Sequence, residues 1–329
     1  MRGVIAGPLR LVVMGTGPFA VPMFRGLVAS PHAIAAVVTR PDHAPPGRPP
    51  PPNPMREAAV AAGLPILDPE KVNDPAAVAA VAALAAELFV VCDYGQILAP
   101  ALLAVAPLGG VNLHGSLLPR HRGAAPVQWT IREGDPLAGV SVIHMTPALD
   151  AGNVILARAT PVGPRETAAD LEARLAELGA EAVIEAIERL QAAVAAGVAP
   201  HEVGVPQDAA QATRAPRLAK ADGIVDWSWP AARIERLRRA LEPWPRATTF
   251  FTRADGVRQR LVLADVAVEP TATSAIPGTV SSTTDDRIVV ACGEGTALAI
   301  LRLVPEGRRE MSAADFLRGS SLAIGARLG

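Results

Sequence analysis

Short aliphatic runs alternate with amphipathic or alanine-rich segments through the first half of the chain. Such runs, ending in glycine, threonine or a polar residue, are typical of buried strands. The segments between them have the composition of helices, and a proline near the first turn supports a helix from Pro18 to Ser30. The alternation predicts a parallel, open α/β sheet with strands at 9–15, 34–40, 64–67, 88–95, 109–116 and 139–146.

A long helix and then a different pattern follow in the second half. Residues 167–170 have the spacing of a capping box, and apolar positions keep one helix face to about residue 196. Residues 197–223 show little periodicity and many small or helix-breaking residues, which predicts a linker. A basic helix at 230–242 and closely spaced strand-like runs then predict a second domain, a small β-barrel or sandwich.

The composition fits a folded protein of two domains in the cytoplasm. The chain has 329 residues, of which 50% are apolar and 19% charged, so it can form packed cores. No apolar run reaches the roughly 18 residues of a membrane-spanning helix, and the N-terminus lacks the features of a targeting peptide. Cys92 and Cys292 lie far apart in apolar runs, which predicts neither a disulfide nor a zinc site.

Charge is unevenly distributed along the chain. Residues 1–209 carry 14 basic and 19 acidic side chains, whereas residues 210–329 carry 17 basic and 13 acidic ones. The excess is densest from Arg214 to Arg260, with 11 basic side chains against 5 acidic. Such a module either binds a polyanion or is the solvated face of a helix, and charge alone does not separate these alternatives.

A glycine-rich turn follows the first predicted strand. Residues 15–20 fit the G-x-G-x-x-A fingerprint of dinucleotide-binding folds, which makes a dehydrogenase one alternative. The next strand ends in Thr39-Arg40 rather than in the acidic residue that would hold a ribose hydroxyl, although Arg40 would suit a 2′-phosphate. Pro18 also removes an amide that would face the pyrophosphate, so the sequence disfavours nicotinamide binding.

Asn112 and His114 lie on the same side of a predicted strand, close to its carboxyl end. Ligands of open α/β sheets collect at that end of the strands. An Asn amide donates a hydrogen bond to a carbonyl oxygen that gains negative charge, and a His serves as acid, base or second donor. Asp150 follows the next strand, and a loop returning to the same edge would let it orient His114 and stabilise its protonated form.

The alternative for a strand-end histidine is a purely structural hydrogen bond. No serine, cysteine or lysine is placed as a nucleophile, since Ser116 lacks the G-x-S-x-G elbow. No histidine or acidic cluster has the spacing of metal ligands. The pattern therefore predicts a metal-free site that polarises a carbonyl group and moves a proton between two bound substrates.

A long motif, NLHGSLLPRHRGAAP at residues 112–126, is followed by LDAG at 149–152. On these residues the chain resembles the 10-formyltetrahydrofolate-dependent formyltransferases, and the resemblance runs nearly end to end. The further matching stretches are Gly15-Thr16, Phe19-Ala20, Thr39, Pro41-Asp42, Gly47-Arg48, Tyr94-Gly95, Asp226-Trp227 and Pro243-Trp244-Pro245. The resemblance implies a Rossmann-like catalytic domain with a parallel-sheet core over 1–200, a linker over 201–222, and an OB-like, tRNA-binding barrel over 223–329.

Three sets of residues match functional positions of the family. The catalytic trio matches Asn112, His114 and Asp150. The tetrahydrofolate-binding loop and the surroundings of the pterin pocket match Ser116, Leu117, Leu118, Pro119, Tyr94, Gly95 and Leu98. The positions that face tRNA match Arg48, Arg217 and Lys220.

The resemblance implies formyl transfer from 10-formyltetrahydrofolate, the co-substrate, to methionyl initiator tRNA by a cytoplasmic monomer without metal or membrane attachment. A neutral amine would attack the formyl carbon, with Asn112 and protonated His114 stabilising the oxyanion and Asp150 keeping His114 charged. Relatives that formylate 4-amino-sugar nucleotides share the motif and the barrel, and they are the alternative, together with a binding module without catalysis. The basic segment favours tRNA over a sugar nucleotide, and the intact trio argues against binding alone.

Two positions depart from the family pattern. The loop after Gly47-Arg48 carries Pro49 to Pro52 where lysines are usual in members that act on tRNA, which implies a stiffer loop with a weaker grip on phosphates. Asp93 stands beside the expected pterin pocket where a small residue is common, so its carboxylate should be partnered or solvated.

Overall fold

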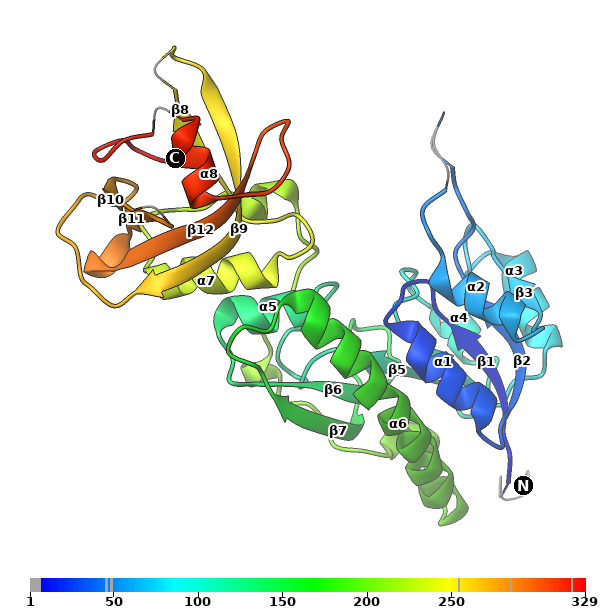
Figure 1. Ribbon diagram of the computed structural model, residues 1–329. Helices are drawn as coiled ribbons and strands as arrows, with labels where there is room; N and C mark the ends of the chain where they lie inside the picture. The colour runs from blue at the N-terminus through cyan, green and yellow to red at the C-terminus, as the bar shows by residue number, and fades with distance from the viewer. Residues whose placement is uncertain (1–6, 45–46, 48–49, 254, 285, 321) are drawn as a thin grey trace. The chain divides into compact units, whose positions relative to one another are not determined.

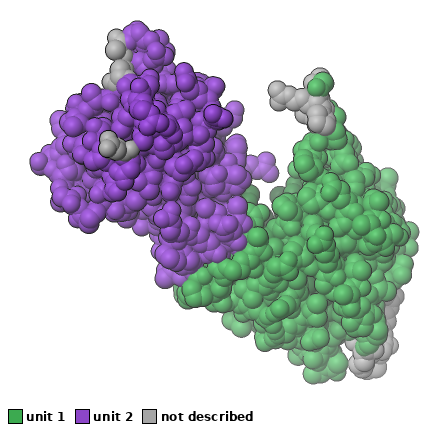
Figure 2. All heavy atoms as spheres, in the orientation of Figure 1, with its two compact units in different colours: residues 1–126, 137–161, 172–216 green, residues 127–136, 162–171, 217–329 purple. Residues whose placement is uncertain are grey.

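The computed structural model describes residues 7–44, 47, 50–253, 255–284, 286–320 and 322–329. The chain is divided into two units, which Figure 2 colours separately. The first unit contains the residues up to 126 together with 137–161 and 172–216, and the second contains 127–136, 162–171 and 217–329. The sequence-based limits of the domains, at residues 200 and 223, stay a prediction.

A seven-stranded sheet with the order β3-β2-β1-β4-β5-β6-β7 forms the centre of the first unit (Figure 1). The first five strands run parallel, and β1 and β4 in the middle consist almost entirely of buried apolar residues, as expected for a sheet covered on both faces. This confirms the predicted parallel α/β core. The bounds are β1 Arg10–Met14, β2 Ala33–Val38, β3 Ile66–Leu67, β4 Leu88–Val91 and β5 Gly110–His114.

The last two strands of this sheet are antiparallel to their neighbours. β6 (Leu137–His144) pairs antiparallel with β5, and β7 (Val154–Pro161) pairs antiparallel with β6. The sequence correctly indicates a strand near 139–146 but not its direction. Residues 145–153 form too short a connection for a crossover helix, so β6 and β7 form a hairpin.

Helices of the first unit begin at signals that are visible in the sequence. Proline starts three of them, because its missing amide hydrogen costs no hydrogen bond in the first turn. Asn53 caps α2, with its side-chain oxygen accepting from the Arg56 amide at 3.1 Å. The bounds are α1 Ala20–Ala29, α2 Pro54–Ala61, α3 Pro75–Ala83, α4 Pro100–Leu103 and α6 Ala168–Ala195.

The second unit is a curled antiparallel sheet of the OB-like type, with the strand order β10-β11-β12-β9-β8 and β13 paired to β12. Helix α7 packs against β9 and β12 and buries Ile234 and Leu237. Figure 1 shows the helix running along these strands. The predicted small β domain is therefore confirmed. Its elements are α5 Pro126–Glu133, α7 Ala231–Ala240, β8 Thr248–Thr252, β9 Arg258–Glu269, β10 Val280–Thr283, β11 Ile288–Ala291, β12 Ala297–Pro305, β13 Met311–Ser312 and α8 Ala313–Arg318.

Much of the predicted linker is hydrogen-bonded to the first unit. We call residues 203–215 the strap. The backbones of Val205 and Val154 exchange two hydrogen bonds, of 2.8 and 2.9 Å, at the start of β7. Further along, the Ala215 amide donates to the Arg122 carbonyl at 2.7 Å. The strap is therefore part of the first unit's fold rather than a free connection.

The contact between α6 and β5 depends on the absence of a side chain at Gly179. A Cβ there would lie 2.6 Å from the Cδ2 atom of Leu113, which is buried, whereas a Cβ at Gly26 in α1 would meet its neighbours at 3.5 Å or more. We expect Gly179→Ala to lower the free energy of unfolding by about 1–3 kcal/mol through overpacking. Gly26→Ala is the matched control and should raise it by up to about 1 kcal/mol through helix propensity. Urea denaturation of both variants measures the difference, and equal effects would contradict this account of the α6–β5 contact.

Candidate functional site

Asn112 and His114 lie at the carboxyl end of β5, in the middle of the sheet's polar edge. In the register of the sheet, Asn112 stands opposite Val91 of β4 and Ile143 of β6, and His114 stands opposite Ser141. The His114 ring is buried and Asn112 is half-buried. The side-chain amide of Asn112 makes no hydrogen bond to any residue that the structure describes, so its NH₂ group and its oxygen are available to a ligand.

The loop between β6 and β7 brings Asp150 back to this edge. The Asp150 carboxylate lies 3.8 Å from His114 Nδ1 and accepts a hydrogen bond of 2.8 Å from the Gly123 amide. Asp150 has a positive φ of 51°, which costs a non-glycine residue roughly 1–2 kcal/mol and has to be held by its surroundings. At Gly152 a Cβ would lie 1.9 Å from the His144 carbonyl oxygen, so only glycine allows this return.

The tautomer of His114 follows from its second nitrogen. Nε2 lies 2.9 Å from the backbone carbonyl oxygen of His121, and because a carbonyl only accepts, Nε2 carries a proton and donates it. Nδ1 is then the atom that faces Asp150 and gains or loses the titrating proton. The 3.8 Å separation exceeds the length of a hydrogen bond, so Asp150 acts on the ring through its charge.

Burial lowers the pKa of His114 below its usual 6.5, because a charged ring loses its hydration there. The Asp150 charge and the hydrogen bond to His121 raise the pKa, and the His121 side chain lowers it, but desolvation is the largest effect. The imidazole is therefore mainly neutral at pH 7. This corrects the expectation that Asp150 keeps His114 charged, which considered the carboxylate without the burial.

The loop after β5 uses its polar groups internally. The buried Ser116 hydroxyl donates to the Arg120 carbonyl at 2.7 Å, and the Ser141 hydroxyl donates to the Ser116 carbonyl at 2.8 Å. The Leu118 amide donates back to the Ser141 hydroxyl at 3.1 Å. Leu117, Leu118 and Pro119 are half-buried. The serine thus shapes the predicted folate loop, and the loop's apolar side chains remain for contacts with a ligand.

Tyr94 and Leu98, which the sequence places near a pterin pocket, belong to the apolar core. Each is 2% exposed, and both pack in a cluster with Met14 and Phe89 beneath the β4–α4 connection. Burial raises the pKa of the Tyr94 phenol to about 12. Gly95 between them has a positive φ of 80° and is exposed. These residues line the connection that follows β4, directly beside β5.

The glycine-rich turn after β1 is occupied by the protein itself. The amides of Thr16 and Gly17 both donate to the Asp93 carbonyl oxygen, at 3.0 and 3.4 Å. A Cβ at Gly17 would lie 1.7 Å from an Asp93 carboxylate oxygen. These amides are therefore already hydrogen-bonded, and the negative charge of the Asp93 carboxylate lies beside them, where it would repel a pyrophosphate. Both features argue against the dinucleotide-binding alternative. Asp93 is exposed, so its charge is solvated, as expected.

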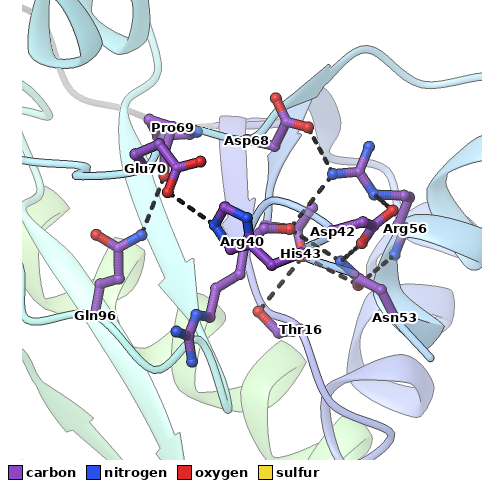
Figure 3. Close-up of polar contacts among 11 residues, drawn as sticks. Thr16, Arg40, Asp42, His43, Asn53, Arg56, Asp68, Pro69, Glu70 and Gln96 are labelled. Carbon is purple, nitrogen blue, oxygen red and sulfur yellow. Dashed lines mark hydrogen bonds and ion pairs between the residues drawn. The ribbon is translucent and has the colours of Figure 1, made fainter. Parts of the chain in front are cut away.

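A polar network fixes the start of the loop after β2 (Figure 3). The Asn53 amide donates to the Arg40 carbonyl at 3.1 Å and to the Asp42 carboxylate at 3.2 Å, and Arg56 pairs with Asp42 at 2.9 Å. The Arg40 side chain extends away from these groups. The network holds the chain just before residues 45–52, the proline-rich stretch.

The predicted tRNA-facing residues are distributed over different parts of the chain. Arg48 lies outside the described residues, as does Pro49 of the proline run. Arg217 and Lys220 lie in the second unit and are exposed. Neither side chain forms an ion pair with another residue that the structure describes.

Sequence reasoning missed a residue at the centre of the site's frame. The Gln207 amide nitrogen donates to the carbonyl oxygens of Asp150 and Gly152, both at 2.8 Å. Its oxygen accepts two hydrogen bonds from the Arg122 guanidinium, of 3.1 and 2.7 Å. No periodicity or motif marks Gln207, because its partners are backbone groups of distant loops. Among the described residues, no group of three or more His, Cys, Asp or Glu is placed to hold a metal ion.

Comparisons with known proteins agree along nearly the whole chain. The formyl transferase family matches residues 9–187, and the formyl transferase C-terminal domain family matches residues 217–321. A methionyl-tRNA formyltransferase of Rhodopirellula baltica is 44% identical over 333 residues, covering 98% of each chain. Another, of Desulfotalea psychrophila, is 41% identical over 320 residues, covering 95% of this chain and 94% of the relative.

Solved structures share the fold at low identity. A sugar 3N-formyl transferase, WlaRD, crystallised with dTDP and 5-N-formyl-tetrahydrofolate, has a TM-score of 0.62 at 12% identity and covers 92% of this chain and all of its own. HypX of Aquifex aeolicus in complex with tetrahydrofolic acid has a TM-score of 0.59 at 16% identity. It covers 98% of this chain, which corresponds to 51% of HypX. At these identities the likeness concerns the fold.

The electrostatics of His114 predict a specific titration. We expect NMR titration of the ring to give a pKa below 6.5, and Asp150→Asn to lower it further, because the carboxylate charge that favours the imidazolium is removed. Asp315→Asn, in the second unit, is the control and should leave the His114 pKa unchanged. A rise in the His114 pKa on Asp150→Asn would show that this carboxylate does not stabilise the ring's charged form.

Proposed function

We propose a catalytic mechanism for this chain on the basis of its family. The chain belongs to the formyltransferase family and, like the relatives that match nearly all of it, is a methionyl-tRNA formyltransferase. It transfers the formyl group of 10-formyltetrahydrofolate to the α-amino group of methionyl initiator tRNA. The observation that carries this function is the identity of 40–44% to proteins of that activity over at least 94% of the chain. Sugar formyltransferases share the fold at far lower identity.

Asn112 is proposed to hold the oxygen of the formyl group during transfer. The methionyl amine forms a bond to the formyl carbon, and the carbonyl oxygen becomes negatively charged before the bond to N10 of the folate breaks. The unpartnered Asn112 amide at the end of β5 is suited to donate a hydrogen bond to that oxygen. Its neighbours in the sheet fix its backbone on both sides, so the donor is oriented before the reaction begins.

His114 is proposed to take the proton that the amine loses. Its mainly neutral ring keeps a lone pair on Nδ1, while Nε2 donates to the His121 carbonyl. The imidazolium that forms is stabilised by Asp150 at 3.8 Å, and its proton then passes to N10 as the folate leaves. The balance is one proton moved from the amine to N10, with one C–N bond formed and one broken.

The loop after β5 and the connection after β4 flank the catalytic strand, which supports their assignment to the folate. We propose that Ser116, through its hydrogen bond to Arg120, keeps Leu117, Leu118 and Pro119 in place against the folate. The other residues assigned to the folate, near its pterin ring, are Tyr94, Gly95 and Leu98. The packing of Tyr94 and Leu98 in the core gives that wall a fixed shape.

The tRNA is proposed to meet Arg48, Arg217 and Lys220. The exposure of Arg217 and Lys220 and the excess of basic side chains from Arg214 to Arg260 support binding to phosphates.

No helix in the described part of the chain is long and apolar enough to cross a membrane. We further propose a cytoplasmic monomer with a catalytic domain at 1–200, a linker at 201–222 and a tRNA-binding domain at 223–329.

Formylation assays test the function directly. We expect the chain to formylate methionyl initiator tRNA from 10-formyltetrahydrofolate, but not free methionine, and to lose this activity in His114→Ala. Elongator methionyl-tRNA and a 4-amino-sugar nucleotide run in parallel. Formylation of the sugar without the tRNA would replace the proposed acceptor while keeping the folate site.

Removing the oxyanion donor should affect the chemical step. Asn112→Ala is expected to lower kcat about 10²–10³-fold with little change in KM for either substrate, because the hydrogen bond forms mainly in the transition state. Asn153→Ala is the matched control, since among the described residues the Asn153 side-chain amide hydrogen-bonds only the His201 carbonyl, at 3.4 Å. A rise in KM at unchanged kcat would mean that Asn112 binds ground-state substrate instead.

The tRNA contacts should be visible in the salt dependence of binding. The double variant Arg217→Ala/Lys220→Ala is expected to reduce the slope of log Kd for the tRNA against log salt by about 2, one unit for each phosphate contact. The KM for the folate should stay unchanged. Arg10→Ala is the control, because Arg10 is the first residue of β1 and so lies at the amino ends of the parallel strands, whereas the candidate site lies at their carboxyl ends. An unchanged slope in the double variant would remove both residues from the tRNA interface.

A further inference from the structure

Two loops that face each other across His114 are connected through one side chain of the strap. One loop, residues 115–125, supplies the His121 carbonyl that accepts from His114 and the Gly123 amide that donates to Asp150. The other, residues 145–153, supplies the Asp150 carboxylate. The hydrogen bond from the Gly123 amide joins the two loops at the Asp150 carboxylate, but it leaves their main chains without a direct link.

Gln207 bridges these loops with all of its polar capacity. Both of its N–H groups are used by carbonyls of the Asp150 loop, at Asp150 and Gly152, each at 2.8 Å. Its oxygen receives the Arg122 guanidinium in a two-pronged contact. The side chain is half-buried, and the strap's backbone is itself fixed at Val205, two residues earlier.

The contacts of Gln207 fall where the chain is strained. Asp150 has a φ of 51° and His121 a φ of 60°, so both residues that act on His114 have left-handed backbone conformations. A non-glycine residue keeps such a conformation only when tertiary contacts determine it. Gln207 donates a hydrogen bond to the carbonyl of Asp150 itself. It also accepts a hydrogen bond from the side chain of Arg122, the residue next to His121.

We propose that Gln207 is a positioning residue of the catalytic site: by bridging the Asp150 and Arg122 loops it sets the separation between the Asp150 carboxylate and the His114 ring. This inference rests on the proposed roles of Asp150 and His114. Removing the bridge frees the main chain at Asp150 to relax to an ordinary backbone conformation, which draws its carboxylate away from His114 and from the Gly123 amide while leaving both side chains present.

The test replaces Gln207 by leucine, which has a similar size and no polar group. Two charged or titratable groups act on His114, Asp150 and His121, and only Asp150 raises its pKa through its charge. With Asp150 displaced, the His114 pKa measured by NMR should fall, and the acidic limb of the kcat–pH profile should shift to lower pH. We expect kcat to fall about 10- to 100-fold, with KM for both substrates nearly unchanged.

Gln211→Leu is the matched control, because Gln211 lies on the same segment and, within the described part of the chain, its side chain hydrogen-bonds only Asp208, at 2.9 Å. It should leave kcat and the His114 pKa as in the unmodified chain. Gln207→Glu is a second variant that keeps the acceptor for Arg122 but loses the donors to the Asp150 loop. It should lower kcat as Gln207→Leu does, whereas the pKa measurement is made on Gln207→Leu, because the added carboxylate charge itself raises the His114 pKa.

The outcomes separate the inference from the function on which it rests. A folded Gln207→Leu variant with unchanged His114 pKa and unchanged pH limb would overturn the positioning role, even if its free energy of unfolding fell. Absence of formylation by the unmodified chain would instead contradict the proposed function. The NMR titration of His114 requires no activity, so it decides the positioning role in that case too.

Discussion

Three stretches of backbone approach one another at the end of β5 more closely than side chains allow, and the site depends on that approach. A Cβ at Gly123 would lie 2.4 Å from the Ala215 carbonyl oxygen, and one at Gly152 would lie 1.9 Å from that of His144. The first glycine seats the strap, and the second returns the Asp150 loop to the sheet edge. Because both glycines are present, the Asp150 carboxylate comes to 3.8 Å from the His114 ring, although the two side chains form no hydrogen bond with each other.

Burial and charge act in opposite directions on that ring. A solvated histidine beside a carboxylate would be protonated at neutral pH and would be a poor base. Here desolvation outweighs the carboxylate, so the ring stays mainly neutral, while Asp150 remains close enough to favour the charged form once a proton arrives. The same enclosure that lowers the pKa therefore leaves a lone pair on Nδ1, which the proposed role of His114 as proton acceptor requires.

The sequence predicted what is local or periodic. The strands from β1 to β5 follow from continuous apolar runs, and the placement of Asn112 and His114 on one strand face follows from their spacing of two residues; both are seen. The direction of β6 did not follow, since an apolar run has the same pattern in a parallel and in an antiparallel strand. The charge state of His114 required its burial, which only tertiary structure gives. Gln207 was missed because its partners are main-chain carbonyls contributed by loops more than fifty residues away.

The first turn of the fold also settles which metabolites the chain ignores. In dinucleotide-binding relatives of this architecture the amides after the first strand receive a phosphate. Here the Asp93 backbone takes those amides, and its carboxylate stands where a phosphate would come. A nicotinamide or flavin dinucleotide would therefore meet an anion where other proteins of this architecture offer amides. A single residue, two positions after β4, thus separates this chain from the dinucleotide-binding proteins that share the turn.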